Sequence, residues 1–257
     1  GEISSREILE SHLDRIEEVE ENINAFISMD KEGALEEADR IDRMIANKED
    51  LGLLAGIPLG VKDNIITKDF KTTAGSKSLE NFQAPYDATV VERIKQHHGI
   101  IIGKCNLDEY AMGGSNRTSY FGPSKNPIDG KVIAGGSSGG SAAAVGAKEV
   151  PLSLGTDTGG SIRQPASYCG VVGVKPSYGY VSRYGLIPLS SSLDQIGVCG
   201  RDVRDANLIL NAISGYDKLD TTSVDLDNII NLDQEKAIEL LKGMKIGLAK
   251  EFFALDM

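Results

Sequence analysis

Two glycine- and serine-rich segments constrain the fold more than any other feature of the chain. They are Gly-Gly-Ser-Ser-Gly-Gly-Ser at residues 135–141 and Thr-Gly-Gly-Ser-Ile-Arg at residues 158–163. Glycine permits positive φ angles and a close approach of the backbone to another group. We expect each segment to open a helix and to present serine hydroxyls beside free N–H groups, an arrangement that suits acyl transfer. The alternative is two ordinary loops of an α/β domain, since serine and glycine dominate turns.

Helical periodicity and short apolar runs alternate along the rest of the chain. A capping box from Ser4 to Glu7 begins an amphipathic helix over residues 4–26, and a second such helix covers residues 34–46. Further helices are predicted from an Asp87 N-cap to Gly99, over residues 106–112 and over residues 202–213. Buried strands are predicted at residues 57–61, 100–103, 150–154, 171–174 and 244–248. This alternation predicts one α/β domain with a mixed or parallel sheet.

The composition narrows the class of protein. The net charge of −11 argues against a large phosphate-binding surface, so a partner is expected to make most of any contact with nucleic acid. Cys105, Cys169 and Cys199 have no CxxC spacing, which predicts reduced, mostly buried thiols in a cytoplasmic protein. No apolar run approaches the length of a membrane span, and nothing has metal-ligand spacing, so neither a membrane nor a metal is expected.

A serine nucleophile needs a base, and the usual histidine is poorly placed. His12 falls on an exposed helix face, and the other two histidines fall at a predicted helix end. A lysine can serve if burial lowers its pKa far below the usual value of about 10.4. Periodicity does not choose among the three lysines that follow apolar strands, Lys62, Lys104 and Lys175. The ordinary interpretation of each is a side chain that reaches back to water.

Four sequence blocks, in this order, resemble the signature of the amidase signature family. They are G-I-P-L-G-V-K-D-N at 56–64, the segment at 135–141, G-T-D-T-G-G-S-I-R at 155–163 and C-G-V-V-G-V-K-P at 169–176. Within the family, residues 108–115, 120–127, 181–187 and 191–197 resemble the A subunits of bacterial amidotransferases that act on Glu-tRNA(Gln) and Asp-tRNA(Asn). The resemblance runs over nearly all of the chain but covers only the N-terminal half or so of the family's usual length.

The resemblance implies a fold and a domain organisation. The fold is the α/β amidase signature fold, with a mixed β-sheet core covered by helices, and the chain is expected to hold an incomplete domain. Residues 1–50 are expected to form an N-terminal helical arm. Residues 51–257 are expected to form the N-terminal part of the catalytic domain.

The resemblance also implies a Ser-cis-Ser-Lys triad. Carried over by position, Ser161 is the nucleophile, Ser137 sits on a cis peptide bond and relays the proton, and Lys62 is the base. Ser138 is the alternative relay residue.

Five further residues complete the expected site. The N–H groups of Thr158, Gly159 and Gly160 are expected to form the oxyanion hole. Met112 and Gly113 are expected to line the substrate pocket.

By the same resemblance, the chain is a glutaminase subunit that hydrolyses glutamine through a γ-glutamyl ester and releases ammonia. B and C partner subunits would use that ammonia to amidate tRNA-borne glutamate or aspartate, with ATP and Mg²⁺ bound by a partner and no cofactor on this chain. The residues that grip glutamine lie mostly in the family's C-terminal half, so we expect this chain alone to be poorly active. The alternatives are a free-standing hydrolase of simple amides and a catalytically silent assembly scaffold.

Overall fold

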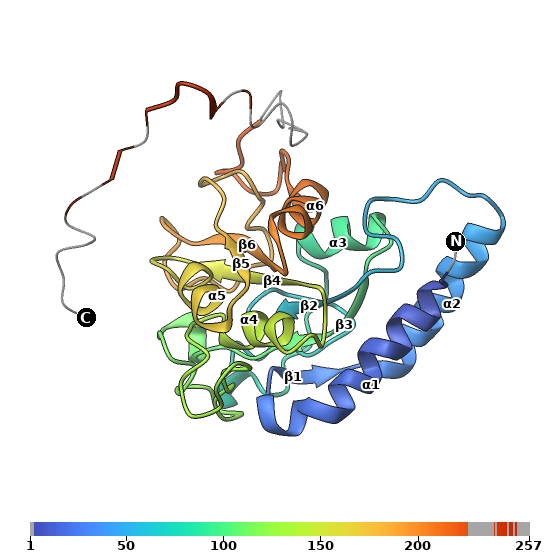
Figure 1. The fold of residues 1–257 in the computed structure, drawn as a ribbon, viewed down its shortest axis with the longest axis horizontal. Coiled ribbons are helices and arrows are strands. Elements are labelled where there is room, and N and C mark those ends of the chain that lie inside the picture. The colour runs from blue at the N-terminus through green and yellow to red at the C-terminus, as the bar shows by residue number, and fades with distance from the viewer. Residues whose placement is uncertain (1–2, 226–238, 240, 246, 249, 251–257) are drawn as a thin grey trace. The chain divides into compact units, whose positions relative to one another are not determined.

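The computed structural model describes residues 3–225, 239, 241–245, 247, 248 and 250. Within them, one mixed sheet has the strand order β1-β3-β2-β4-β6-β5 (Figure 1). The strands are β1 (Phe26–Met29), β2 (Pro58–Lys62), β3 (Ile100–Cys105), β4 (Leu152–Asp157), β5 (Val172–Val174) and β6 (Gln195–Gly200). Strand β2 runs parallel to both β3 and β4, whereas the β1–β3, β4–β6 and β5–β6 pairs are antiparallel. The expectation of a mixed sheet is therefore confirmed.

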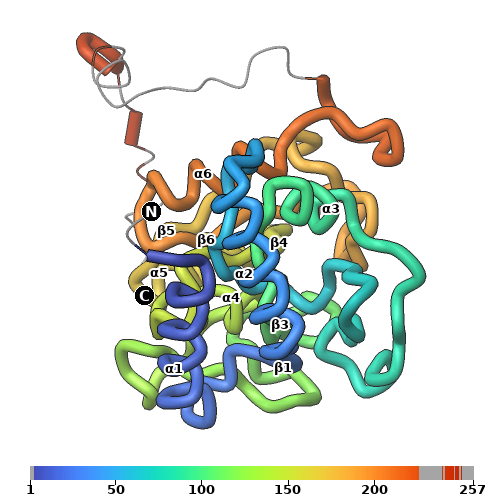
Figure 2. Tube along the Cα trace, turned by 90° about the vertical axis from the view of Figure 1, so that its right-hand side faces the viewer, coloured from blue at the N-terminus to red at the C-terminus, as the bar shows by residue number. Residues whose placement is uncertain are grey.

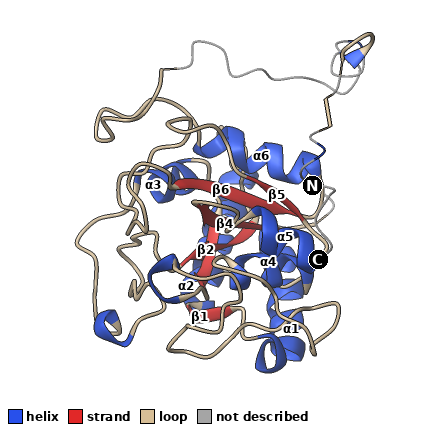
Figure 3. Ribbon diagram, turned by 90° about the vertical axis from the view of Figure 1, so that its left-hand side faces the viewer, coloured by secondary structure: helices blue, strands red, loops and turns tan. Residues whose placement is uncertain are grey.

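Helices cover both faces of this sheet (Figure 3). They are α1 (Ser5–Ile23), α2 (Lys31–Ala46), α3 (Thr89–Gln96), α4 (Gly139–Gly146), α5 (Arg163–Cys169) and α6 (Val203–Ile213), with 3₁₀ turns η1 (Lys77–Leu79) and η2 (Glu109–Ala111). Helices α3 and α6 pack together on one face, and α4 and α5 pack together on the other. This layered arrangement buries the apolar residues of both faces, as an α/β fold requires.

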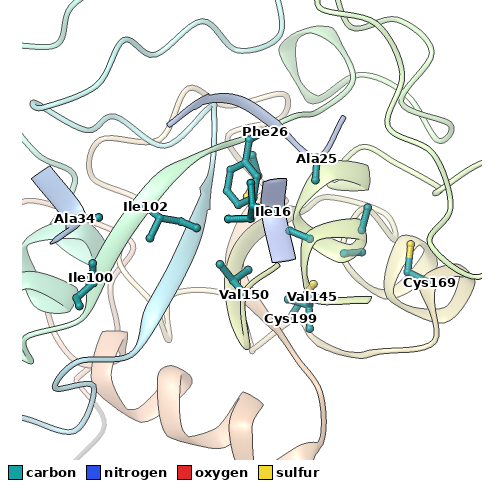
Figure 4. Packing of buried hydrophobic residues seen from close by; sticks show 14 of the residues in the cluster. Ile16, Ala25, Phe26, Ala34, Ile100, Ile102, Val145, Val150, Cys169 and Cys199 are labelled. Carbon is teal, nitrogen blue, oxygen red and sulfur yellow. The ribbon is translucent and has the colours of Figure 1, made fainter. Parts of the chain in front are cut away.

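The strands alternate between two apolar clusters. In β3, Ile100 and Ile102 point into the cluster with α1, α2 and α4, whereas Ile101 packs against the cluster with α3 and α6. Figure 4 shows Ile102 together with Ile16 and Val145 in the first of these clusters. Burying each such aliphatic side chain contributes roughly 1.5–3 kcal/mol. The sheet is consequently a rigid platform for the loops at its edge.

The two N-terminal helices pack against each other, as Figure 2 shows, and also against the rest of the domain. Leu9 and Ile16 of α1 are fully buried in the same cluster as Val145 and Val150. The described residues up to Asp225 accordingly belong to one compact unit. The division of the chain into a helical arm at residues 1–50 and the N-terminal part of the catalytic domain at residues 51–257 stays a prediction.

Two strands escaped the sequence analysis, and one helix start was wrong. Helix α1 ends at Ile23 because Asn24 adopts the left-handed conformation, and the chain then pairs with β3 as strand β1. Strand β6 was also missed. The N-cap of α3 is Ala88 rather than Asp87, whose carboxylate instead accepts the N–H of Lys68 and pairs with Lys95.

Two other expected elements differ from the structure. The helix expected at residues 106–112 is only the three-residue turn η2, in which Tyr110 has a φ of 51°. The strand expected at residues 244–248 includes Ile246, which lies outside the described residues, and the four residues around it have no regular structure.

Candidate active site

The predicted catalytic residues gather at one edge of the sheet. Lys62 ends β2 and Asp157 ends β4, and because these strands are parallel neighbours their carboxyl ends lie together. Helices α4 and α5 begin within the two glycine-rich segments, at Gly139 and Arg163, so each segment opens a helix as expected. Ligands of open α/β sheets usually bind outside the carboxyl ends of the strands.

Lys62 reaches one of the two serines assigned by resemblance. Its Nζ lies 2.8 Å from the Ser137 Oγ, and both residues are fully buried. Burial lowers the pKa of Lys62 from its ordinary value of 10.5 to about 7, although Asp108, Asp157 and Asp194 oppose the shift. A large share of the Lys62 amine is therefore neutral at physiological pH and able to accept a proton.

The turn that carries Ser137 is built around close contacts. The Gly136–Ser137 peptide bond is cis, as the resemblance implied. The Gly136 N–H donates to the Gln164 Oε1 at 2.9 Å. A side chain at residue 136 would clash with the Asp108 carboxylate, so glycine is required there.

The other two candidate lysines lie elsewhere. Lys104 is fully buried and pairs with Asp63 at 3.3 Å, while also donating to the Ile65 carbonyl at 2.6 Å. Its side chain does not reach water, so the ordinary interpretation is wrong for this residue. Lys175 is half-buried, and its Nζ donates to the Pro176 carbonyl. Of the three lysines, Lys62 alone contacts a serine of the glycine-rich segments among the described residues.

The three histidines have partners away from this edge. His12 Nδ1 lies 3.3 Å from the Lys148 carbonyl. His97 Nδ1 accepts the N–H of Leu53, and His98 lies beside Arg40. The geometry thus supports a lysine rather than a histidine as the base.

The loop that carries Ser161 is held by the Asp157 carboxylate. Asp157 accepts the N–H groups of Gly160 at 2.7 Å and Ile162 at 3.0 Å, and it forms a two-point ion pair with Arg163. Burial alone would raise the pKa of Asp157, but the Arg163 side chain and these N–H groups together lower it to about 2. Gly160 has a φ of +131°, which favours glycine in this tight loop.

The partly exposed loop at residues 158–161 carries hydrogen-bond donors that are free to bind a substrate. In the described part of the chain, the Ser161 hydroxyl and the N–H groups of Thr158 and Gly159 have no hydrogen-bond partner. The Gly160 N–H is bound to Asp157 instead. A part for Gly160 in an oxyanion hole stays a prediction, and it requires this N–H to be shared with Asp157 or released from it.

Met112 and Gly113 lie on a neighbouring surface loop. Met112 is 66% exposed, and Gly113 sits against the Asp108 carboxylate, where a side chain would clash. The Gln164 Nε2 donates to the Gly114 carbonyl at 3.0 Å, which ties this loop to the start of α5. Their place in a substrate pocket stays a prediction.

Several residues that shape the site were not singled out from the sequence. Thr156 Oγ1 lies 2.7 Å from the Lys62 Nζ, and Gln164 and Asp108 brace the loops around Ser137. Thr156 and Asp157 lie in the same sequence block as Ser161, G-T-D-T-G-G-S-I-R at residues 155–163. Their chemistry depends on which strand lies beside β2, which the local pattern does not reveal.

Replacing Asp157 with asparagine is expected to lower the free energy of unfolding by about 2 kcal/mol at pH 7. The reason is that the pKa of Asp157 falls from its ordinary 3.8 to about 2 on folding. The stability that this carboxylate contributes is present above pH 4 and is lost as the pH falls toward 2. In urea unfolding, the deficit of Asp157→Asn should therefore be full at pH 7 and roughly half as large at pH 3, which lies between the folded and unfolded pKa values of this carboxylate.

The exposed loop residue Asp129 offers the control for this prediction. Asp129→Asn is expected to leave both curves within about 0.5 kcal/mol of wild type, as for most surface substitutions. A deficit for Asp157→Asn that is as large at pH 3 as at pH 7 would contradict the role of the ionised carboxylate.

Comparison with known proteins decides the family. The sequence profile of the Amidase family matches residues 7–257. The chain belongs to the amidase family. Its relatives include the A subunit of glutamyl-tRNA(Gln) amidotransferase from Gloeobacter violaceus, which is 53% identical over 98% of this chain.

Solved structures of amidase-family proteins share the fold. The A subunit of glutamyl-tRNA(Gln) amidotransferase from Thermotoga maritima matches 87% of the chain and 46% of its own, with a TM-score of 0.77 and 45% identity. The peptide amidase of Stenotrophomonas maltophilia matches 92% of the chain and 50% of its own, with a TM-score of 0.84 and 37% identity. The amidase signature fold is thereby confirmed.

This amidase-family chain spans about half the length of the curated relatives it matches, 51% of the Gloeobacter protein.

Cys105, Cys169 and Cys199 are buried free thiols, as expected. Across the described residues, no helix is both long and apolar enough to cross a membrane. The same residues contain no group of three or more histidine, cysteine or acidic side chains that could hold a metal ion.

Proposed function

We propose that this chain is the N-terminal part of the glutaminase subunit of a tRNA-dependent amidotransferase. The observation that carries the proposal is the buried Lys62 amine, which has a pKa of about 7 and lies 2.8 Å from the Ser137 Oγ. The next residue, Ser138, donates its N–H to the Ser161 carbonyl at 3.0 Å and so joins this segment to the loop of Ser161. Identities of about 50% to proteins named as the A subunit of glutamyl-tRNA(Gln) amidotransferase support this choice within the family.

The proposed reaction begins with proton transfer along the triad. Neutral Lys62 accepts the Ser137 proton while Ser137 accepts the Ser161 proton, and the Ser161 Oγ attacks the γ-carboxamide carbon of glutamine. Free N–H groups of the loop at 158–161 stabilise the resulting oxyanion. The proton returns to the departing nitrogen, which leaves as ammonia, and the γ-glutamyl ester on Ser161 is then hydrolysed by water.

The released ammonia would be used by B and C partner subunits in the cytoplasm. One of these partners would bind ATP and Mg²⁺, activate the carboxylate of Glu-tRNA(Gln) or Asp-tRNA(Asn), and amidate it. The net charge of −11 agrees with tRNA being bound mainly by a partner. Met112 and Gly113 would contribute to the glutamine pocket.

A free-standing amidase is the second candidate, favoured by the fold shared with the peptide amidase of Stenotrophomonas maltophilia. The two functions differ in the fate of the ammonia, which an amidotransferase transfers to an aminoacyl-tRNA and a free-standing amidase releases. Glutamine-dependent amidation of misacylated tRNA, after copurification with a tRNA-binding partner, would support the amidotransferase. Hydrolysis of simple amides, with no such partner, would support the amidase and overturn our proposal.

A diazo-ketone analogue of glutamine is expected to alkylate Ser161 with loss of N₂. The adduct should be mapped by peptide mass spectrometry in the full-length protein together with its partners. Ser161→Ala should abolish the adduct, whereas Ser167→Ala, at an exposed serine of α5, should retain it. A label on any other residue contradicts the assignment. The 257-residue chain alone is expected to show little glutaminase activity.

A further inference from the structure

A neutral lysine amine can serve as a base only if its lone pair faces the proton. The amine has two N–H bonds and one lone pair, arranged roughly as a tetrahedron with the Cε bond. Lys62 Nζ has three oxygen neighbours: Ser137 Oγ at 2.8 Å, Thr156 Oγ1 at 2.7 Å and the Thr156 carbonyl oxygen at 3.4 Å. Thr156 therefore offers an acceptor for each of the two N–H bonds.

We infer that Thr156 is a positioning residue that engages both N–H bonds of neutral Lys62 and thereby turns the lone pair toward the Ser137 hydroxyl. The inference rests on the proposed function, because it concerns the same proton transfer. This role requires no contact of Thr156 with the substrate or with the reacting atoms of Ser161. It acts only through Lys62.

Thr156 is itself held firmly in place. It lies in β4 opposite Ile196 of β6, so its backbone cannot turn freely. Its hydroxyl also accepts the Asn64 Nδ2 at 3.3 Å. The Ser138 Oγ donates to the Thr156 carbonyl at 3.0 Å and accepts the Thr156 N–H at 3.2 Å.

These contacts also give Ser138 a role distinct from the relay. Its hydroxyl proton is directed to the Thr156 carbonyl, and its oxygen is occupied by the Thr156 N–H. Ser137, by contrast, has its hydroxyl beside the Lys62 amine. Of the two adjacent serines, Ser137 thus faces Lys62, whereas Ser138 fixes Thr156, the residue that orients Lys62.

The charged and titratable groups around Lys62 would be unchanged by a substitution at Thr156. They are Asp157 at the end of β4, Asp108 on the loop after β3, and Asp194 and Cys199 before and within β6. All four favour the charged amine and oppose the effect of burial. Loss of the Thr156 hydroxyl should therefore lower the rate of the reaction mainly at pH values above about 7, where the Lys62 amine is already neutral.

The test compares Thr156→Val with Thr156→Ser in a pH–rate profile. An alkyl fluorophosphonate is used as the probe, because the Ser161 Oγ displaces fluoride while its proton passes through Ser137 to Lys62. Labelling of Ser161 is followed by mass spectrometry from pH 6 to pH 9.5. The isosteric valine is expected to lower the high-pH plateau by about 10- to 100-fold, and serine to stay within about threefold of wild type.

Thr72→Val is the matched control. Thr72 is also a fully buried threonine whose hydroxyl contacts a buried lysine, since its Oγ1 lies 3.1 Å from Lys104. This control should keep the wild-type plateau, and a drop equal to that of Thr156→Val would assign the effect to general loosening of the domain.

Three further outcomes overturn the inference. An unchanged plateau in Thr156→Val shows that the hydroxyl does not position the amine. A faster reaction shows that the hydroxyl donates to the lone pair and blocks it. Wild-type protein with no label on Ser161 removes the proposed function itself, and the inference falls with it. If wild-type protein is labelled on Ser161 and Thr156→Val is labelled at the same rate, the inference is wrong but the proposed function stands.

Discussion

Replacing Lys62 with methionine is expected to slow acylation of Ser161 by about 10²- to 10⁴-fold, the usual contribution of a general base. Methionine resembles the lysine stem in volume, but its thioether sulfur is not basic enough to take the Ser137 proton. In the wild-type protein, the rate should rise with pH and level off above about 7, where the amine is neutral. Fluorophosphonate labelling of Ser161 measures both the rate and its pH dependence.

The half-buried Lys175 provides a matched control, since it too follows a strand. Lys175→Met is expected to label within about threefold of wild type, because its amine contacts no serine of the site. Labelling of Lys62→Met at near wild-type rate at neutral pH would remove Lys62 from the mechanism. A pH profile that rises only near 10 would show that burial does not lower the pKa of the amine.

The same Lys62→Met variant is expected to be more stable than wild type below pH 7, by roughly 2–4 kcal/mol. The folded protein lowers the pKa of Lys62 from 10.5 to about 7, so the charged lysine opposes folding. Wild-type stability should fall as the pH drops from about 10.5 to 7 and change no further below that through this group. The lost hydrogen bonds to Ser137 and Thr156 offset part of the gain.

Urea unfolding at pH 6, 8 and 10 checks this stability difference. The advantage of Lys62→Met should shrink as the pH rises and nearly disappear at pH 10. An advantage that grows with pH would contradict the direction of the shift. A variant that is both inactive and more stable would show that the site keeps its base at a cost to the fold.

Periodicity predicted the central strands because each contains a short apolar run, although the strand predicted at residues 150–154 ends three residues before β4 does. It missed β1 because Phe26 continues the helical spacing of α1, and the left-handed turn at Asn24 has no strong sequence signal. It missed β6 because Gln195, Gly197 and Gly200 interrupt its apolar residues, so the segment is not the continuous apolar run that is typical of a fully buried strand.

The glycine-rich segments indicated the serines, but residue pattern alone left three lysines equal. What separates them is the pairing of β2 with β4, which brings Lys62 to Thr156 across 94 residues of sequence. Local sequence does not encode such pairing, so the choice of Lys62 required the family resemblance. The same reason explains why Thr156 and Gln164 were not singled out.

The second fully buried lysine, Lys104, is expected to behave in the opposite way to Lys62. Replacing Lys104 with methionine should lower the free energy of unfolding by about 3–5 kcal/mol at pH 7, the usual cost of breaking a buried ion pair. The substitution leaves the Asp63 carboxylate buried, and among the described residues its remaining donors are the N–H and hydroxyl of Thr73. Urea unfolding of the two methionine variants at pH 7 measures the contrast directly.

The pH dependence identifies the cause of the Lys104→Met deficit. Burial already raises the pKa of Asp63, and loss of Lys104 removes the attraction that opposes this rise. The deficit should therefore be full above the folded pKa of Asp63 and should shrink as the pH falls toward its unfolded value near 3.8.

Adding Asp63→Asn, which removes the charge but can still accept from Thr73, should recover most of the stability at pH 7. A deficit that is independent of pH and not relieved by Asp63→Asn would assign it to packing. Taken with Lys62→Met, the expected result is that Asp63 makes Lys104 structural. Lys62, whose hydrogen-bond partners in the described part of the chain are neutral oxygens, is free to exchange its proton.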